Sequence, residues 1–298
     1  MTPRVRGELY LLATTVIWGS TFAAVKITML GMSVLSLMAF RFAAASLLFL
    51  AVFRSRLFPL SRDAVRRGTI LGALLFLGFM AQTIGLQDTT AAKSSFITSM
   101  MVVFAPFLQV LISRKSPTYG NVLGIVIVCA GLWLLTSPEG SGFTIGDWLT
   151  LLCAFVFAMY IVYLDVVSRT IEPLQLSFLQ VTTCAVLSWG FLLPFERPSF
   201  PSSGDPLLAL VYLTVFATVL TTLVQTRFQK ETTPTRAAII FSVEPLFATL
   251  FAALLINEEI SSQGIAGGAM IIVGILVSEL SELFPGLRNP VLISNDPL

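Results

Sequence analysis

Ten apolar runs of about twenty residues each take up most of this 298-residue chain. Such a run is long enough to cross the hydrocarbon core of a bilayer as a helix. Only 11% of the residues are charged, against about 25% in soluble domains, so lipid must solvate much of the surface. We therefore expect an all-α integral membrane protein with ten transmembrane helices, at about 8–27, 34–53, 68–87, 92–113, 118–136, 146–165, 174–194, 206–227, 234–256 and 262–281.

The basic residues alternate between the connecting segments and predict an orientation. Lys/Arg excess in short loops marks the cytoplasmic side. With the N-terminus inside, the cytoplasmic segments hold fourteen of the 18 basic residues, the opposite side holds Lys93 and Arg197, and Lys26 and Arg41 fall within spans. Because a wrong helix count would destroy this alternation, it supports ten spans with both termini in the cytoplasm.

Several kinds of chemistry are disfavoured by the residues present. The chain has no histidine, the commonest metal ligand and general acid or base, and its three cysteines lie inside apolar runs. No Walker motif, G-x-S-x-G, H-E-x-x-H or cysteine-rich metal pattern occurs. The net charge of +2 is too small to indicate nucleic-acid binding. We expect no cofactor, no metal and no enzymatic activity.

The two halves of the chain resemble each other in the order of their polar and glycine landmarks. An offset of 139 residues relates Gly7-Glu8-Leu9 to Gly146-Asp147-Trp148, and an offset of 143 relates Lys93 to Arg236. Five helices is an odd number, so the second copy must enter the membrane from the opposite side. We predict two inverted five-helix repeats, at 1–138 and 144–282, followed by a flexible tail at 283–298. In transporters with this architecture the substrate site lies near mid-membrane between the repeats.

These features resemble a known family. Trp18-Gly19-Ser20-Thr21-Phe22, Arg41-Phe42 and Glu244-Pro245 look like the drug/metabolite transporter superfamily, and most closely its EamA-type members with ten helices. The resemblance covers about residues 8–280. It implies a central cavity built from helices 1–4 and 6–9, and many bacterial members export amino acids or related metabolites. In one departure, Glu244-Pro245 has no match in helix 4, where Pro106 falls about one turn later than the repeat predicts.

Glu244 is the most informative position for function. It lies near the middle of the ninth span, where a carboxylate is costly and usually faces a cavity or a partner. Pro245 beside it removes a backbone donor. The carboxylate could bind a proton for coupling or contact a substrate amine, and it could equally be a structural acid that ties helices together.

Two basic residues invite similar alternatives. Arg41, in the outer half of the second span, could bind a substrate carboxylate, or it could serve the structure by pairing with Glu244 or bonding helix-end carbonyls, and we favour the structural role. Lys93 begins the fourth helix, where the positive helix end disfavours a cation, on the side poor in basic residues. It could attract anions at the outer mouth, but extended side chains also reach lipid headgroups readily, and we favour that second role.

Other polar and aromatic side chains complete a predicted cavity suited to small amphipathic solutes. The candidates, together with Arg41, Lys93 and Glu244, are Trp18, Thr21, Phe22, Gln82, Thr83, Ser99, Met101, Tyr160, Tyr163, Gln225 and Phe241. Membrane helices also use such side chains to bond each other, which is the competing role for each. For the small-residue motifs Gly120-x3-Gly124 and Gly264-x3-Gly268 we predict close helix packing.

The sequence thus predicts a secondary transporter of the bacterial inner membrane, exporting amino acids or related small metabolites by alternating access. An importer or a uniporter of other small organic solutes is the alternative, and a membrane-embedded sensor or enzyme is the alternative of another class. We expect a small-molecule substrate and surrounding lipid as partners. The oligomeric state is left open, because one monomer can contain the whole pathway.

Overall fold

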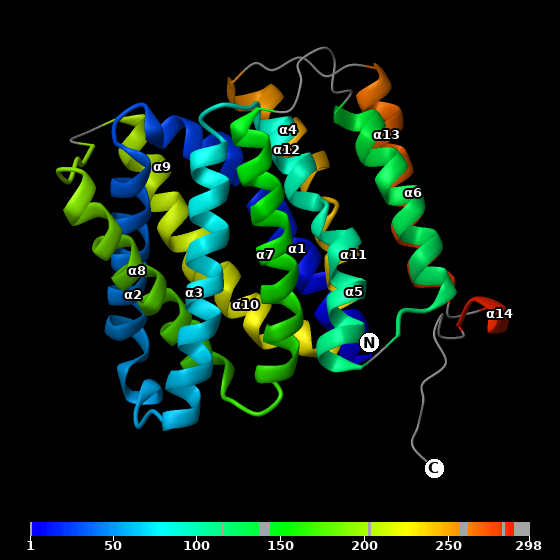
Figure 1. Cartoon of the computed structure of the whole chain (residues 1–298), viewed down its shortest axis with the longest axis horizontal. Helices are drawn as coiled ribbons and strands as arrows, with labels where there is room; N and C mark the ends of the chain where they lie inside the picture. Colours follow the sequence, from blue (N-terminus) through cyan, green and yellow to red (C-terminus); the bar gives the residue numbers. More distant parts are fainter. Residues whose placement is uncertain are drawn as a thin grey trace.

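The computed structural model describes residues 2–114, 116–136, 144–201, 204–256, 262–281 and 284–288. Within them the regular elements are helical, and ten helical rods run roughly along one direction (Figure 1). The first half contains α1 Pro3–Met29, α2 Val34–Leu57, α3 Arg62–Gly85, α4 Ala91–Ser99, α5 Met101–Ser113 and α6 Tyr119–Thr136. The second contains α7 Ile145–Val167, α8 Pro173–Phe195, α9 Asp205–Thr214, η1 Val215–Leu220, α10 Thr221–Phe228, η2 Gln229–Glu231, α11 Pro234–Phe241, α12 Glu244–Ile256 and α13 Ser262–Leu280.

Each of the ten predicted spans corresponds to one of these rods. Eight of them are long and apolar enough to cross a membrane, and α6 and α13 contain the two shorter apolar segments, Tyr119–Leu134 and Ile265–Ser278. The chain is therefore an all-α, multi-pass membrane protein. Of the predicted tail, Pro285–Arg288 form one short helix, α14, and residues 289–298 lie outside the described part.

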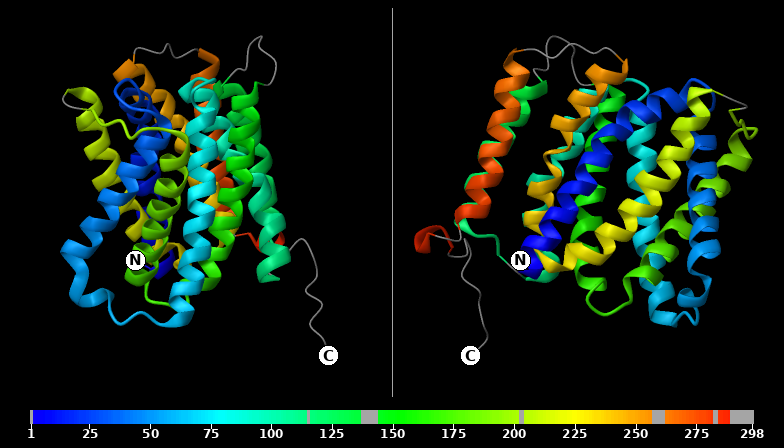
Figure 2. Two further views of the ribbon diagram at one scale, coloured as in Figure 1. Left: turned by 60° about the vertical axis from the view of Figure 1, so that its left-hand side comes forward. Right: turned by 180° about the vertical axis from the view of Figure 1, so that it is seen from behind.

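The rods form a main bundle with one separate pair at its side. In the bundle α2 and α3 pack against α8, α3 also packs against α7, and α1 packs against α9, α10, α11 and α12. The pair α6 and α13 lies side by side at one edge (Figure 2). In Figure 1 α1 begins at the lower end and α7 begins at the upper end, so corresponding helices of the two halves run in opposite directions.

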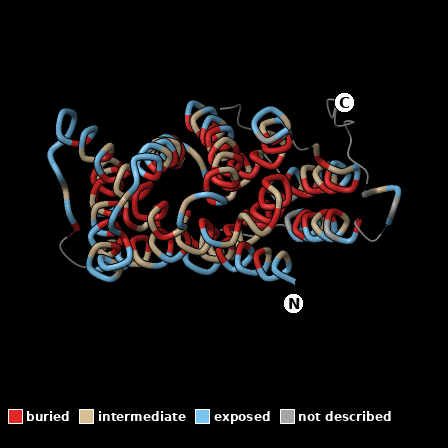
Figure 3. The backbone as a smooth tube through the Cα atoms, turned by 90° about the horizontal axis from the view of Figure 1, so that it is seen from below, coloured by how far each residue is buried: buried red, intermediate tan, exposed pale blue. Residues whose placement is uncertain are grey.

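Side-chain burial fits a bundle that is solvated by lipid. Buried residues line the interior of the bundle and exposed ones lie on its outer surface (Figure 3). Many exposed residues are large and apolar, among them Leu111 and Ile145, both 77% exposed. A soluble monomer rarely exposes so much contiguous apolar surface, whereas lipid tails accept it at no cost.

The fourth rod of each half is broken at the same place. Helix α4 ends at Ser99 and α5 begins at Met101, while α11 ends at Phe241 and α12 begins at Glu244. Both breaks are closed by i to i−3 bonds: Met100 N–H donates to the Ile97 carbonyl at 3.1 Å, and Val243 N–H donates to the Ile240 carbonyl at 3.1 Å. These two bonds are related by the offset of 143, although only the second break carries a proline, Pro245, directly after it.

Candidate functional site

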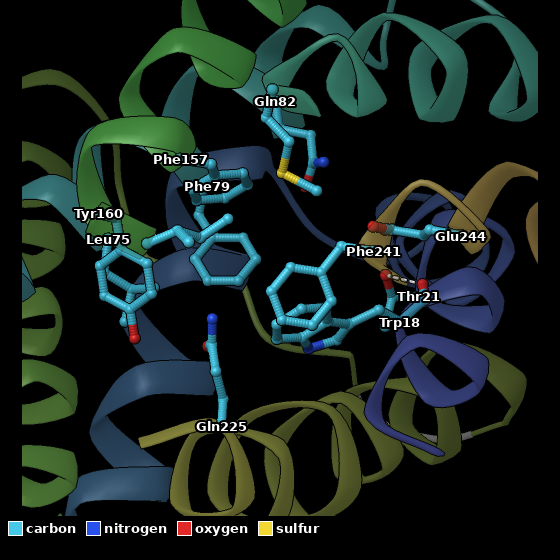
Figure 4. Close-up of a pocket in the computed structure, with 12 residues that line it drawn as sticks. Trp18, Thr21, Leu75, Phe79, Gln82, Phe157, Tyr160, Gln225, Phe241 and Glu244 are labelled. Carbon is cyan, nitrogen blue, oxygen red and sulfur yellow. Dashed lines mark hydrogen bonds between the residues drawn. The ribbon is translucent and has the colours of Figure 1, made fainter. Parts of the chain in front are cut away.

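A cavity of about 50 Å³ lies between the two halves of the bundle (Figure 4). Each half contributes six of its twelve lining residues. From the first half they are Trp18, Thr21, Leu75, Phe79, Gln82 and Met101, and from the second Phe157, Tyr160, Ile161, Gln225, Phe241 and Glu244. We call this the central cavity.

Four pairs of lining residues are related by the offsets that the sequence landmarks define. The offset of 139 relates Trp18 to Phe157 and Thr21 to Tyr160, and the offset of 143 relates Gln82 to Gln225 and Met101 to Glu244. Eight of the twelve lining residues thus occupy corresponding positions in the two halves. Trp18 corresponds to another aromatic residue, Gln82 corresponds to another glutamine, and Thr21 and Tyr160 both carry a hydroxyl group. At the fourth pair the thioether of Met101 stands where the other half has the carboxylate of Glu244.

Glu244 brings the one formal charge to the cavity lining, as far as the structure describes it. It is the first residue of α12, directly after the break in the ninth span, and its carboxylate points into the cavity (Figure 4). The positive end of a helix stabilises a carboxylate at that position. Close approach of α1 holds this turn in place, because a Cβ on Gly19 would lie only 3.1 Å from the Glu244 carbonyl oxygen.

The Glu244 carboxylate has no protein partner among the described residues. It is 5% exposed, and it accepts no hydrogen bond and forms no ion pair there. A buried carboxylate normally binds a counter-charge or a hydrogen-bond donor. In the alternative role, a structural acid would tie neighbouring helices together through its carboxylate. The described residues show no such bond.

Aromatic rings form most of the remaining wall. The Trp18 and Phe241 rings lie 5.1 Å apart, and the Phe79 and Phe157 rings meet edge to face at 5.3 Å. Such pairs hold their rings in fixed orientations and add about 0.5–1.5 kcal/mol each beyond area burial. The faces turned to the cavity present the negative side of the ring quadrupole to a ligand.

The polar lining residues are held by their own bonds. The Tyr160 hydroxyl donates to Gln180 Oε1 at 2.7 Å, and Gln225 Nε2 donates to Gln229 Oε1 at 3.0 Å. Gln82 Nε2 donates to Thr98 Oγ1 at 3.1 Å. These bonds fix the side chains before any ligand arrives, which lowers the entropy cost of binding.

Arg41 lies behind the cavity wall rather than in it. Its Nε donates to Thr218 Oγ1 at 2.7 Å and its Nη2 to the Ala217 carbonyl at 3.3 Å, both in the wide π-turn η1. Its guanidinium carbon lies 4.9 Å from the centre of the Phe79 ring, and Phe79 lines the cavity whereas Arg41 does not. Of the three roles considered for Arg41, the described contacts include only the bond to a helix carbonyl.

Lys93 and its counterpart Arg236 join the two halves at opposite ends. Lys93 Nζ lies 2.7 Å from Asp147 Oδ2, and Arg236 Nε lies 3.1 Å from Glu8 Oε1. The offsets of 143 and 139 exchange these two pairs. Lys93 therefore binds a buried acid of α7, which neither of the roles predicted for it had included.

Four further candidates lie outside the cavity lining. Phe22 is turned about 100° from Thr21 on α1 and packs in a second apolar cluster with Leu213 and Ala248. Thr83 is buried against Met38, Ser99 is buried at the break after α4, and Tyr163 packs at the edge of the main core. Membership of a polar stripe in sequence does not fix the direction of a side chain, which is why these four candidates are not brought together with the lining residues.

Four lining residues were absent from the sequence prediction: Leu75, Phe79, Phe157 and Ile161. Apolar residues in apolar helices carry no signal that separates cavity from core. Phe157 is the exception, because the offset of 139 from Trp18 leads directly to it.

The glycines of α6 pack closely against α13. A Cβ on Gly124 would lie 2.7 Å from the Gly274 carbonyl oxygen, and one on Gly120 would overlap Ser281. On α13 the close approaches occur at Gly267 and Gly274. Gly268 is buried, and the surroundings of Gly264 lie outside the described part. Among the described residues, no group of three or more His, Cys, Asp or Glu side chains is arranged to hold a metal ion.

The chain matches the sequence profile of the EamA-like transporter family twice, at residues 5–137 and 144–280. It is 32% identical to an Archaeoglobus fulgidus protein named "Uncharacterized transporter", over 93% of this chain and 87% of the relative. It is 25% identical to the "Uncharacterized inner membrane transporter YedA" of Escherichia coli, over 92% of this chain and 91% of the relative. One crystal structure shares the fold, with a TM-score of 0.78 at 18% identity, covering 93% of this chain and 97% of that one.

Proposed function

Because this chain belongs to the EamA-like transporter family, we propose that it exports amino acids or related small metabolites through the central cavity by alternating access. The chain is a multi-pass membrane transporter of small molecules, and the proposal adds the substrate class, the direction and the mechanism. The observation that carries it is the central cavity itself, which both halves line with corresponding residues around one unpaired carboxylate.

Matched features at opposite ends support alternating access. Inverted halves that differ slightly in conformation can exchange their conformations, which closes one end of the bundle and opens the other. The breaks at Met100 and Val243 are equivalent, and so are the ion pairs Lys93–Asp147 and Arg236–Glu8. Each ion pair links a fourth-rod start to the first helix of the other half, so movement of one half is transmitted to the other.

The distribution of basic residues supports a proposal for the sidedness of the protein in the membrane. Fourteen of the 18 basic residues belong to segments that the topology assigns to one end of the bundle. We propose that this end faces the cytoplasm, that both termini lie there, and that the membrane is the bacterial inner membrane.

Glu244 is the proposed coupling residue. An unpaired carboxylate in a cavity can bind a proton and a substrate amine in turn, and competition between them couples the two fluxes. Uniport and import stay open as alternatives, because topology does not set the direction of transport.

The test is flux into liposomes that contain the purified protein. Labelled amino acids, sugars and nucleosides are presented with and without a proton gradient, and protein-free liposomes are the control. The proposal expects saturable flux of at least one amine-bearing solute, with dependence on the gradient that Glu244→Gln abolishes. Absence of saturable flux across the whole panel would contradict a transport function, and unchanged gradient dependence in the variant would remove Glu244 from coupling.

A further inference from the structure

Two of the equivalent pairs in the cavity lining carry similar groups, and one pair differs in charge. Trp18 corresponds to Phe157 and Gln82 to Gln225, so these pairs present similar groups from both halves. Met101 and Glu244 are also equivalent, and each is the first residue of the helix that follows a break. Met101 carries a neutral thioether and Glu244 a carboxylate. The second half of the chain therefore places a negative charge in the cavity lining at this position, and the first half does not.

No cation balances that charge from within the described cavity lining. Arg41 is 1% exposed, and it donates to the Thr218 hydroxyl and to the Ala217 carbonyl. Its guanidinium stacks on the ring of Phe79, and Phe79 rather than Arg41 lines the cavity. A ligand carboxylate inside the cavity would therefore meet Glu244 and ring faces, with no basic group to pair with it.

The rest of the wall favours a positive charge on an apolar body. The faces of Trp18, Phe157 and Phe241 attract cations and also bury apolar surface. The Gln82 and Gln225 amides can bond a neutral polar group but cannot neutralise a charge. A protonated amine attached to a flat apolar body is the solute that this combination fits.

We propose that Glu244 makes the central cavity selective for organic amines, with zwitterionic amino acids second and organic anions excluded. The inference rests on the proposed function, because it concerns the same cavity and narrows its substrates. The Glu244 carboxylate contacts the ammonium group of the solute. Met101 occupies the equivalent position in the first half, so a carboxylate placed there would also contact the ammonium group. Amines and amino-acid derivatives without a free carboxylate are then preferred to amino acids.

The experiment measures binding by calorimetry to the full chain in lipid nanodiscs, using probes that differ in charge. The probes are 2-phenylethylamine, phenylalanine, 2-phenylethanol and 3-phenylpropionate. We expect the amine to bind at least about tenfold more tightly than phenylalanine, because the additional carboxylate of phenylalanine would be buried near Glu244 with no basic group of the lining to pair with it. We expect no binding of 3-phenylpropionate.

Two variants assign the selectivity to the carboxylate. Glu244→Gln keeps the shape and should bring the amine to the level of 2-phenylethanol. The double variant Met101→Glu with Glu244→Met moves the carboxylate to the equivalent helix start and should restore the preference for the amine. If the double variant does not fold, Glu244→Gln against the unchanged chain decides alone.

The outcomes separate this inference from the transport function. Equal binding of the amine and phenylalanine, preference for the anion, no measurable binding of the amine, or an unchanged order in Glu244→Gln would overturn the inference. Absence of flux for every solute, with the binding order intact, would contradict transport and leave the selectivity standing. Saturable flux of neutral solutes that is indifferent to Glu244 would contradict the selectivity alone.

Discussion

Lys93 of α4 binds Asp147 of α7 at 2.7 Å, and the same bond recurs between the equivalent residues at the other end of the bundle. There Arg236 of α11 binds Glu8 of α1 at 3.1 Å. Each pair connects the first half of the chain to the second. Close backbone packing accompanies both: a Cβ on Gly146 would lie 2.5 Å from the Gly85 carbonyl oxygen, and one on Gly7 would lie 3.0 Å from that of Phe228.

Removal of the Lys93 charge should destabilise the fold. Asp147 is 0% exposed, so Lys93→Met leaves a buried carboxylate without its cation. We expect a loss on the order of 2 kcal/mol in the free energy of unfolding, less than for a fully buried pair because Lys93 is partly exposed. Thermal unfolding in detergent measures it. Lys26→Met is the control, because Lys26 forms no ion pair with a described residue; equal effects of the two substitutions would contradict the assignment.

The α6–α13 pair should be sensitive to a single methyl group. In Gly124→Ala the new Cβ would lie 2.7 Å from the Gly274 carbonyl oxygen and 2.8 Å from Ser278 Cβ, so the helices must move apart. We expect a cost of about 1–3 kcal/mol. Gly190→Ala is the matched control, since nothing lies within 4 Å of its Cβ, and it should be neutral or stabilising by up to about 1 kcal/mol. Unfolding curves that rank the two variants in the opposite order would rule out close packing as the role of Gly124.

Arg41 should matter for stability rather than for substrate recognition. Arg41→Lys keeps the charge but loses the two-point donation to Thr218 and the Ala217 carbonyl. We expect a lower melting temperature, with amine binding unchanged within about twofold. Retained stability together with altered selectivity for anionic solutes would instead make Arg41 a substrate ligand.

The spans could be predicted from the sequence because the bilayer sets their length and the loops carry their charges. The breaks in the fourth rods could not. Val102 stands at the position that corresponds to Pro245, yet the first half breaks at Met100 all the same. Proline is therefore not the shared cause, and the sequence carries no other marker of the break.

Only some of the residues that line the cavity could be predicted from the sequence. Eight of the fourteen candidates line it, among them Trp18, Gln225 and Glu244. Phe22 and Thr83 do not, because a rotation of about 100° per residue decides between cavity and core, and tertiary packing sets that rotation. The partner of Lys93 was hidden because Asp147 is 54 residues away along the chain.

The central claim is that the central cavity opens to each side of the membrane in turn, and thiol accessibility tests it most directly. Thr21→Cys is placed in a chain whose Cys129, Cys153 and Cys184 are replaced by alanine, because Thr21 lines the cavity and bonds only within its own helix, to the Trp18 carbonyl. A membrane-impermeant thiol reagent is added to one side of oriented, ion-tight vesicles and then to the other. We predict reaction from both sides, slowed from each by saturating 2-phenylethylamine. Reaction from one side only, or reaction from both sides that the amine does not slow, would contradict alternating access through this cavity.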